Sequence, residues 1–141
     1  MMNTSYEANI FHPKDLKEIR KRFYPHLVQR FGKDQLLVDA SISEAIVNSW
    51  KHGHGSSTDT PIKVKVTFLN SMMIVRVQDC GEGFNWKEYQ IQSDMKHWFP
   101  NVEDLEDRGR GIVLMLRVMD KLRYNNKGNE CVLMKKYRRQ E

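Results

Sequence analysis

The stretch of this sequence that most constrains its fold and chemistry is Ser43-Glu44-Ala45-Ile46-Val47-Asn48-Ser49-Trp50-Lys51-His52-Gly53. Within it, Glu44, Asn48 and His52 are four residues apart, so on a helix they share one face, each a turn above the last. A carboxylate with a carboxamide one turn away can hold a divalent cation and act as a base. On spacing alone, an ordinary polar helix face is the commoner explanation.

A second informative segment, Asp79-Cys80-Gly81-Glu82-Gly83-Phe84, comes directly after a predicted strand. Glycines at alternate positions let the backbone turn sharply and let a flat ligand approach it closely. Asp79, at the strand end, can accept a hydrogen bond from the exocyclic amine of a nucleobase. A simple turn is the alternative. The segment is not a dinucleotide-binding motif, because no third glycine opens a helix at the required offset.

A third segment, Arg108-Gly109-Arg110-Gly111-Ile112, opens a short apolar helix predicted from Ile112 to Met119. Free backbone N–H groups at a helix start suit an anion, and two arginines add charge-assisted contacts. The phosphate-loop pattern ending in Gly-Lys-Ser/Thr is absent, so any nucleotide is held in another manner. A purely structural helix start is again the alternative.

Two long helices are predicted in the first third of the chain. Leu16, Ile19, Phe23, Leu27 and Phe31 recur at helical spacing. Within this helix Pro25 is expected to produce a kink or a break, and Gly32 to end it. Asp34 is then expected to cap a second helix that runs to about Lys51.

Five strands complete the predicted fold. Tyr6 to Phe11 is a candidate edge strand, residues 62–69 and 72–77 form a hairpin, and residues 122–124 and 131–135 form a closing hairpin. The aperiodic region between Asp79 and Gly111 is long for a simple connection, which indicates a functional lid. The resulting order, β-α-α-β-β-lid-α-β-β, predicts an α+β two-layer sandwich. In it, a mixed, mostly antiparallel sheet is covered on one face by about three helices.

Composition narrows the class of protein further. The chain has 141 residues, which predicts a single domain over 1–141, and its mean hydropathy of −0.66 argues against a membrane span. No apolar leader begins the sequence, and the two cysteines, Cys80 and Cys131, are too few for a disulfide framework, so a bacterial cytoplasmic location is expected. Residues 14–33 and 121–141 each carry a net charge of +5. These basic blocks suit phosphate or an acidic partner, although a solvated surface explains them as well.

The three segments, in this order and at these separations, resemble the ATP-binding (Bergerat) fold shared by gyrase, Hsp90, histidine kinases and MutL. More closely, nearly the whole chain is similar to the anti-sigma factor serine/threonine kinases. Residues 43–53 resemble the N box of that family, Asp79 to Phe84 its first glycine box, and Arg108 to Met115 its second. The ending from Tyr124 to Lys135 resembles its last two strands.

The resemblance implies a role for each matched residue. Glu44 corresponds to the general base that takes the proton of the attacking serine hydroxyl, and Asn48 to the Mg²⁺ ligand beside the phosphates. Asp79 corresponds to the reader of the adenine amine, with Gly81 and Gly83 in the same pocket. The remaining implied ATP-binding residues are His52, Phe84, Arg108, Gly109, Arg110, Gly111, Ile112 and Asn129.

Two features depart from the family pattern. Asn129 stands where much of the superfamily has a threonine, and its amide can still form a hydrogen bond near Asp79. The lid, about residues 85–107, contains the cluster Lys96-His97-Trp98-Phe99, which matches no motif and is expected to serve as core or as a partner contact.

The resemblance implies an ATP- and Mg²⁺-dependent kinase that phosphorylates a serine or threonine of an antagonist protein and can also hold a sigma factor. A homodimer formed through the first strand and helix is expected, and neither nucleic acid nor membrane is an expected partner. One alternative is an ATP-binding adaptor that sequesters or activates a partner without phosphate transfer. Another is a detached histidine-kinase catalytic domain, which is disfavoured because no helical hairpin with a phosphoacceptor histidine is present.

Overall fold

The computed structural model describes residues 3–53, 59–81 and 107–137. Five strands form one sheet in the order β1-β2-β3-β5-β4. Their bounds are β1 Thr4–Ile10, β2 Ile62–Phe68, β3 Met72–Gln78, β4 Lys121–Tyr124 and β5 Glu130–Lys136. Every strand pair in this sheet is antiparallel, so the expectation of a mixed sheet is wrong in that detail, while the α+β class is confirmed.

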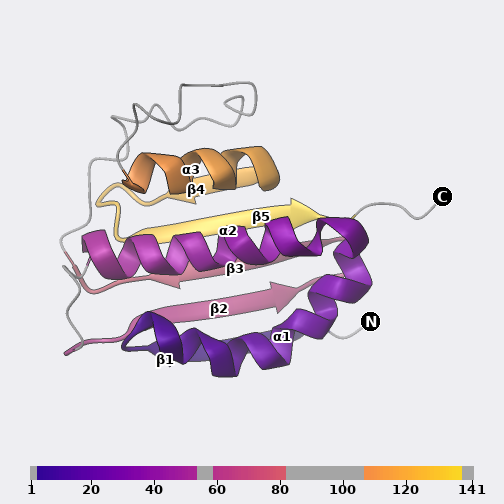
Figure 1. The fold of residues 1–141 in the computed structure, drawn as a ribbon, viewed down its shortest axis with the longest axis horizontal. Coiled ribbons are helices and arrows are strands. Elements are labelled where there is room, and N and C mark those ends of the chain that lie inside the picture. Colours follow the sequence, from indigo (N-terminus) through magenta and orange to yellow (C-terminus); the bar gives the residue numbers. More distant parts are fainter. Residues whose placement is uncertain (1–2, 54–58, 82–106, 138–141) are drawn as a thin grey trace.

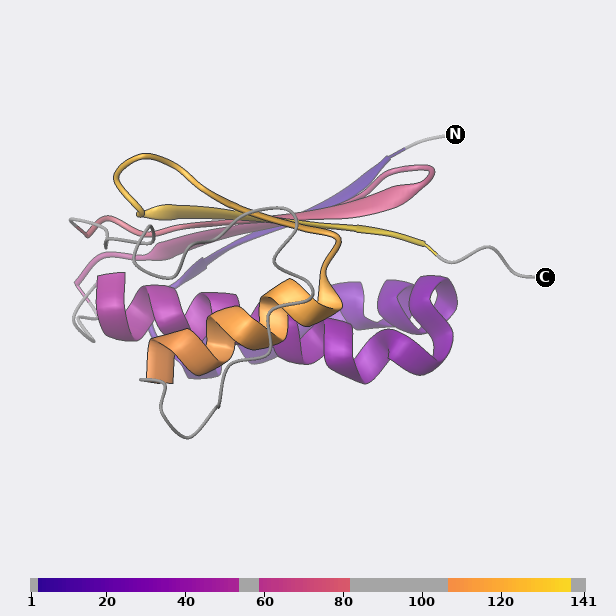
Figure 2. The same cartoon turned by 90° about the horizontal axis from the view of Figure 1, so that it is seen from above.

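Three helices, α1 Leu16–Phe31, α2 Gln35–Asn48 and α3 Asp107–Val118, lie on one face of the sheet (Figures 1 and 2). The other face carries no described element. The strands alternate between buried residues that face the helices and more exposed residues that face away, as in β2, where Ile62, Val64 and Val66 are buried. The core therefore lies between the sheet and the helical layer.

Helix α1 is continuous through Pro25, so the predicted break does not occur. Its buried stripe consists of Ile19, Phe23, Leu27 and Phe31, and Gly32, with φ of +54°, ends it. A single 3₁₀ turn, Gly32–Asp34, then leads directly into α2. For this reason Asp34 has helical backbone angles and makes no side-chain capping bond to α2, contrary to the sequence-based expectation.

The largest boundary difference concerns α3. The helix begins at Asp107 rather than at Ile112, so the Arg108–Gly111 segment lies within α3 instead of in a turn that precedes it. Glycine lowers helix propensity by about 1 kcal/mol relative to alanine, which conceals the helical pattern in the sequence. In α2, a π-helical turn, Ser49–Gly53, extends the helix beyond its C-terminal residue Asn48.

Candidate functional site

The elements predicted to bind a nucleotide come together at one end of the molecule. The C-terminal end of α2, the end of β3, the start of α3 and the turn between β4 and β5 share that end in both views (Figures 1 and 2). These three element ends and the turn carry, in that order, Asn48, Asp79, Gly111 and Asn129. Segments far apart in the sequence thereby bring one predicted residue each to the same region.

Helix α3 packs directly against the Glu44 and Asn48 face of α2. A Cβ atom added to Gly111 would lie 2.6 Å from Glu44 Oε2 and 2.8 Å from Asn48 Nδ2, closer than real Cβ atoms approach such groups. The missing side chain of Gly111 is therefore what allows the α3 backbone to sit beside the carboxylate and the carboxamide. Both polar side chains approach α3 at Gly111, its fifth residue. The free N–H groups of the first turn, which precedes Gly111, suit an anion.

The amide of Asn48 is the clearest sign of an unmet interaction at this site. Its Nδ2 atom is buried and has no hydrogen-bond partner in the described part of the chain. A buried polar group without a partner costs about 1–3 kcal/mol, so such groups normally have a ligand, an ion or a water beside them. Since the O and N ends of an amide are interchangeable by a flip, Asn48 can present either a donor or a metal-binding oxygen there.

Asp79 follows β3 and is 4% exposed. Its backbone N–H donates to the Asn129 carbonyl at 2.9 Å, which continues the ladder between β3 and β5 by one step. Its Oδ1 accepts from the Gly81 N–H at 2.8 Å, an Asx-type turn that holds the carboxylate at the start of the glycine-containing loop. The carboxylate is thus fixed and buried, as recognition of a nucleobase amine requires.

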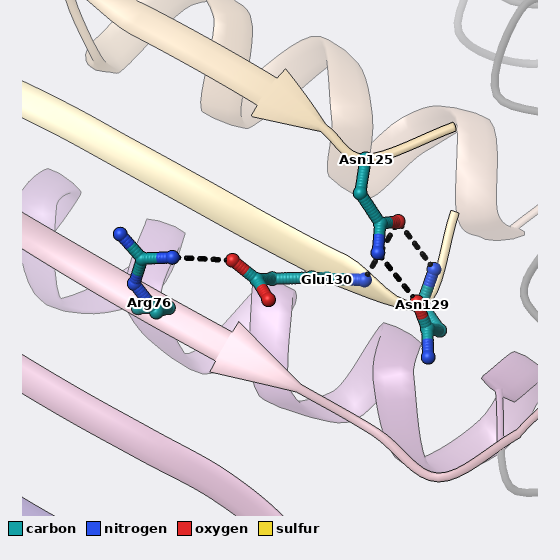
Figure 3. A network of polar contacts seen from close by, with 4 residues as sticks. All are labelled: Arg76, Asn125, Asn129 and Glu130. Carbon is teal, nitrogen blue, oxygen red and sulfur yellow. Dashed lines mark hydrogen bonds and ion pairs between the residues drawn. The ribbon is translucent and has the colours of Figure 1, made fainter. Parts of the chain in front are cut away.

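The turn between β4 and β5 is organised by Asn125, which the sequence analysis did not single out. Its Oδ1 accepts from the Gly128 N–H at 2.8 Å. The same oxygen accepts from the N–H groups of Asn129 and Glu130 at 3.0 and 3.2 Å (Figure 3). Its Nδ2 donates to Asn129 Oδ1 at 2.6 Å. The sequence signal is an Asn at the first position of a turn and a Gly, here with φ of +82°, at the fourth.

This turn is in turn joined to Asp79. Asn129 Nδ2 donates to the Asp79 carbonyl at 3.4 Å, so the amide at the position of the family threonine does reach the Asp79 segment. Nearby, Arg76 of β3 pairs with Glu130 at the start of β5 at 2.5 Å (Figure 3). Asn125, Asn129 and Glu130 together fix the turn against the end of β3.

Several predicted residues fall partly or wholly outside what the structure describes. Gly83, Phe84, most of the lid from residue 85 and the Lys96–Phe99 cluster lie outside the described residues. The backbone of His52 lies in the π-helical turn, and those of Arg108, Gly109 and Arg110 lie in α3. Ile112 also lies in α3, and its side chain is fully buried in the core.

The donor set suits Mg²⁺ held jointly with phosphate. No group of three or more His, Cys, Asp or Glu side chains is arranged to hold a metal ion within residues 3–53, 59–81 and 107–137. Mg²⁺ is commonly bound by one or two protein oxygens together with substrate phosphates and water. The Asn48 amide, whose Nδ2 has no partner among the described residues, fits that mode of binding beside the Glu44 carboxylate.

Among α1, α2, α3 and the rest of the described chain, no helix has the length and apolar character needed to cross a bilayer.

Comparisons with known proteins show the family of this chain. The model of the histidine kinase-like ATPase domain family matches residues 12–136. An anti-sigma F factor from Clostridium novyi (strain NT) is 30% identical over 101 residues, which are 70% of this chain and 68% of the relative.

Two relatives named serine-protein kinase RsbW are similar over the same region. The protein from Oceanobacillus iheyensis is 26% identical over 97 residues, and that from Bacillus subtilis is 28% identical over 99 residues. Each match covers 69% of this chain and 61% of the relative, so the chain spans about three fifths of the length of these two proteins.

Proposed function

This chain belongs to the histidine kinase-like ATPase domain family, and from that premise we propose that it is an ATP-dependent serine/threonine kinase acting as an anti-sigma regulatory factor. Its substrate would be an antagonist protein in a partner-switching pathway. The printed names of its relatives, anti-sigma F factor and serine-protein kinase, support this class of activity. The single observation that carries the proposal is the convergence of Glu44 and Asn48 on Gly111.

In this proposal Glu44 accepts the proton of the attacking hydroxyl. The hydroxyl oxygen forms a bond to the γ-phosphorus, the bond from that phosphorus to the bridging oxygen breaks, and ADP leaves with the displaced charge. Phosphoryl transfer depends mainly on alignment and charge neutralisation, which explains why few side chains are required. Mg²⁺, when bound, supplies charge neutralisation, and Asn48 would hold it.

The nucleobase would be recognised at the other side of the site. We propose that the Asp79 carboxylate accepts a hydrogen bond from the adenine amine, with Gly81 allowing the base to approach the backbone. The bond from the Gly81 N–H to the Asp79 carboxylate supports this assignment, because it holds the carboxylate in one orientation before any ligand arrives. The bond from the Asn129 amide to the Asp79 carbonyl supports it by fixing the backbone there. We further propose that the N–H groups at the start of α3 bind phosphate.

Partner proteins and oligomeric state complete the proposal. An antagonist protein would carry the phosphoacceptor serine or threonine, and a sigma factor would be the protein released when the antagonist binds. We also propose a homodimer formed through β1 and α1, the edge strand and the helix next to it. Light scattering of the purified protein would test the dimer directly.

The decisive experiment combines ATP binding with phosphate transfer. The purified protein would be incubated with γ-labelled ATP, Mg²⁺ and the antagonist-type proteins of its genome, beside Glu44→Ala and Asn48→Ala variants. Glu7→Gln is a matched control, because Glu7 is exposed on β1 on the sheet face away from the helices. Label on a serine of one antagonist, lost in both site variants and retained in the control, would support the kinase.

Two other outcomes would point elsewhere. Tight ATP binding without transfer to any antagonist would favour an adaptor that responds to ATP but does not transfer phosphate. Absence of ATP binding would reject the nucleotide site as well as the kinase.

A further inference from the structure

The face of the sheet that points away from α1, α2 and α3, here termed the open face, is strongly basic. Strand alternation places six cations on it, namely Lys63, Lys65, Arg76, Lys121, Arg123 and Lys136. The same alternation places only two acidic side chains there, Glu7 and Glu130. Six cations against two anions leave the open face with a net charge of +4.

Both anions of the open face are already engaged. Glu7 pairs with Lys65 at 3.4 Å, and Glu130 pairs with Arg76. The other four cations, Lys63, Lys121, Arg123 and Lys136, have no acidic partner in the part of the chain that the structure describes. Their charge is available to a binding partner.

The centre of the open face is apolar. Ile74 of β3 pairs across the strands with Met134 of β5, and Val132 lies between Arg76 and Arg123. These apolar side chains are only partly buried, although a sheet of this kind can cover one face alone. Beside them, a depression of about 520 Å³ is lined by residues of β1, β2 and β3, including Glu7, Lys65, Arg76 and Gln78.

We infer that the open face is a docking surface for a protein whose surface is acidic around an apolar centre. Charge complementarity selects the sign of the partner, and the strip of Ile74, Val132 and Met134 selects a polypeptide. Single-stranded nucleic acid is disfavoured, because the open face of the described strands carries no aromatic side chain on which a base can stack. A second copy of the chain is disfavoured, because a two-fold contact would bring six cations against six cations.

The size of the surface indicates a transient contact. Seven-residue strands span about 23 Å and five strands about 19 Å, so the face presents a planar area of about 440 Å². Stable complexes commonly bury about 800 Å² on each partner. Association should consequently be fast, driven by charge and sensitive to salt.

The inference does not depend on ATP, because the open face is on the opposite side of the sheet from α2 and α3 (Figure 2). It can be tested with a fluorescein-labelled Glu/Leu copolymer peptide as an acidic, partly apolar probe. Binding would be followed by fluorescence anisotropy at low and at about 0.15 M ionic strength, where the Debye length is about 8 Å. ATP affinity would be measured in the same samples and is expected to be unchanged by the variants.

The test variant is Lys63→Glu with Arg123→Glu. Both side chains are exposed, and their cross-strand neighbours, Asn9, Gln78 and Val132, are uncharged, so the reversal brings no like charges into register. The matched control, Lys17→Glu with Lys33→Glu, makes the same change of charge in the helical layer. We expect the test variant to weaken peptide binding at least about tenfold and the control to change it less than about twofold.

Four results would overturn the inference. The first is that the wild-type protein fails to bind the peptide, and the second is that the helical control weakens binding as much as the test variant does. The third is that a duplex or single-stranded DNA competitor binds this face more tightly than the peptide does. The fourth is that light scattering shows a wild-type dimer that the test variant converts to monomer. Equal melting temperatures of all variants would exclude unfolding as the cause of a loss.

Discussion

Gly111 of α3 lies so close to Asn48 of α2 that a single methyl group on the glycine would come within 2.8 Å of the asparagine Nδ2. The nearest atoms are the ends of side chains, Glu44 Oε2 and Asn48 Nδ2, and not backbone. A methyl group can therefore be accommodated only by moving the two groups on which the proposed chemistry depends. Packing of α3 and arrangement of the site are thus the same structural feature.

Gly111→Ala should separate activity from stability. Alanine favours a helix by about 1 kcal/mol over glycine, and the displaced side chains can rotate, so we expect the free energy of unfolding to change by no more than about 1 kcal/mol. Phosphate transfer should fall at least about tenfold, because Glu44 and Asn48 leave their positions. Urea unfolding and the labelled-ATP assay measure the two effects.

Gly32→Ala is the matched counterpart. Gly32 has φ of +54° with no atom within 4 Å of an added Cβ, so the substitution strains the backbone without touching the site. It should cost about 1–2 kcal/mol of stability and leave transfer unchanged in folded protein. If the two alanine variants instead showed parallel losses of stability and activity, Gly111 would have no specific role at the site.

Asn125→Ala should destabilise the turn that supports Asp79. The substitution removes one acceptor from three backbone N–H groups and a donor from Asn129, at an expected cost of about 1–3 kcal/mol. The Asn129–Asp79 contact should loosen, and ATP affinity should fall with it. Urea unfolding and ATP titration are the measurements.

Asn126→Ala serves as the control for that experiment, because Asn126 is exposed in the same turn. Its stability should remain within about 0.5 kcal/mol of the wild type. An Asn125→Ala protein with unaltered stability and ATP affinity would show that the turn holds its shape without this side chain.

The element order could be predicted from the sequence because periodicity is strong where burial is one-sided. Ile62, Val64 and Val66 alternate with exposed residues in β2, and the four-residue spacing of Ile19, Phe23 and Leu27 marks α1. The start of α3 could not be predicted in the same way, because glycines 109 and 111 interrupt the pattern. Only the tertiary contact with α2 explains why glycine at position 111 is compatible with a helix.

The candidate site was predicted as residue types but not as an arrangement. Spacing placed Glu44 and Asn48 on one helix face, and the family resemblance gave them their roles. That Gly111 is the residue they meet depends on how α3 packs against α2, which the sequence does not show. Asn125 was overlooked because turn-forming asparagines are common, and its three bonds to the Asn129 segment become visible only in three dimensions. The Asp34 cap was wrong because a 3₁₀ turn feeds α2 directly.

The two cysteines should differ sharply in reactivity. Cys131 is buried, and burial raises the pKa of its thiol to about 12, so almost no thiolate exists at pH 8. Cys80 is exposed and adjoins Asp79. A thiol reagent should modify Cys80 rapidly in the native protein and both cysteines after unfolding. The Cys80→Ser substitution should abolish the reaction of the native protein.

Bound ATP should protect Cys80 from the thiol reagent. Because Cys80 follows the carboxylate proposed to bind adenine, saturating ATP should slow its modification several-fold. Labelling of Cys131 in the native protein would contradict its burial. Labelling of Cys80 at the same rate with and without ATP would contradict a nucleotide bound beside it.

The protein should lose stability in mild acid through His26. Arg30 can only donate, so its 2.7 Å contact makes His26 Nδ1 an acceptor, and Nε2–H then donates to the Tyr6 hydroxyl at 2.7 Å. The ring is also stacked on Phe68 at 4.6 Å between centroids. Burial, which disfavours the charged imidazolium, is the main cause that lowers the pKa of His26. The charge of Arg30 lowers it further, since protonation would replace the Arg30 hydrogen bond with two facing cations.

The sign of the effect follows from linkage. Below about pH 6.5, the ordinary histidine value, the unfolded chain binds a proton that the folded chain resists, so stability present above that pH is lost as the pH falls toward the lowered folded-state pKa. Urea unfolding from pH 8 to pH 5 should show this loss, and His26→Gln, which keeps an acceptor for Arg30 but does not titrate, should reduce the slope. An equal slope in both proteins would mean that other groups cause the acid sensitivity and that His26 does not link β1 to α1 in the manner described.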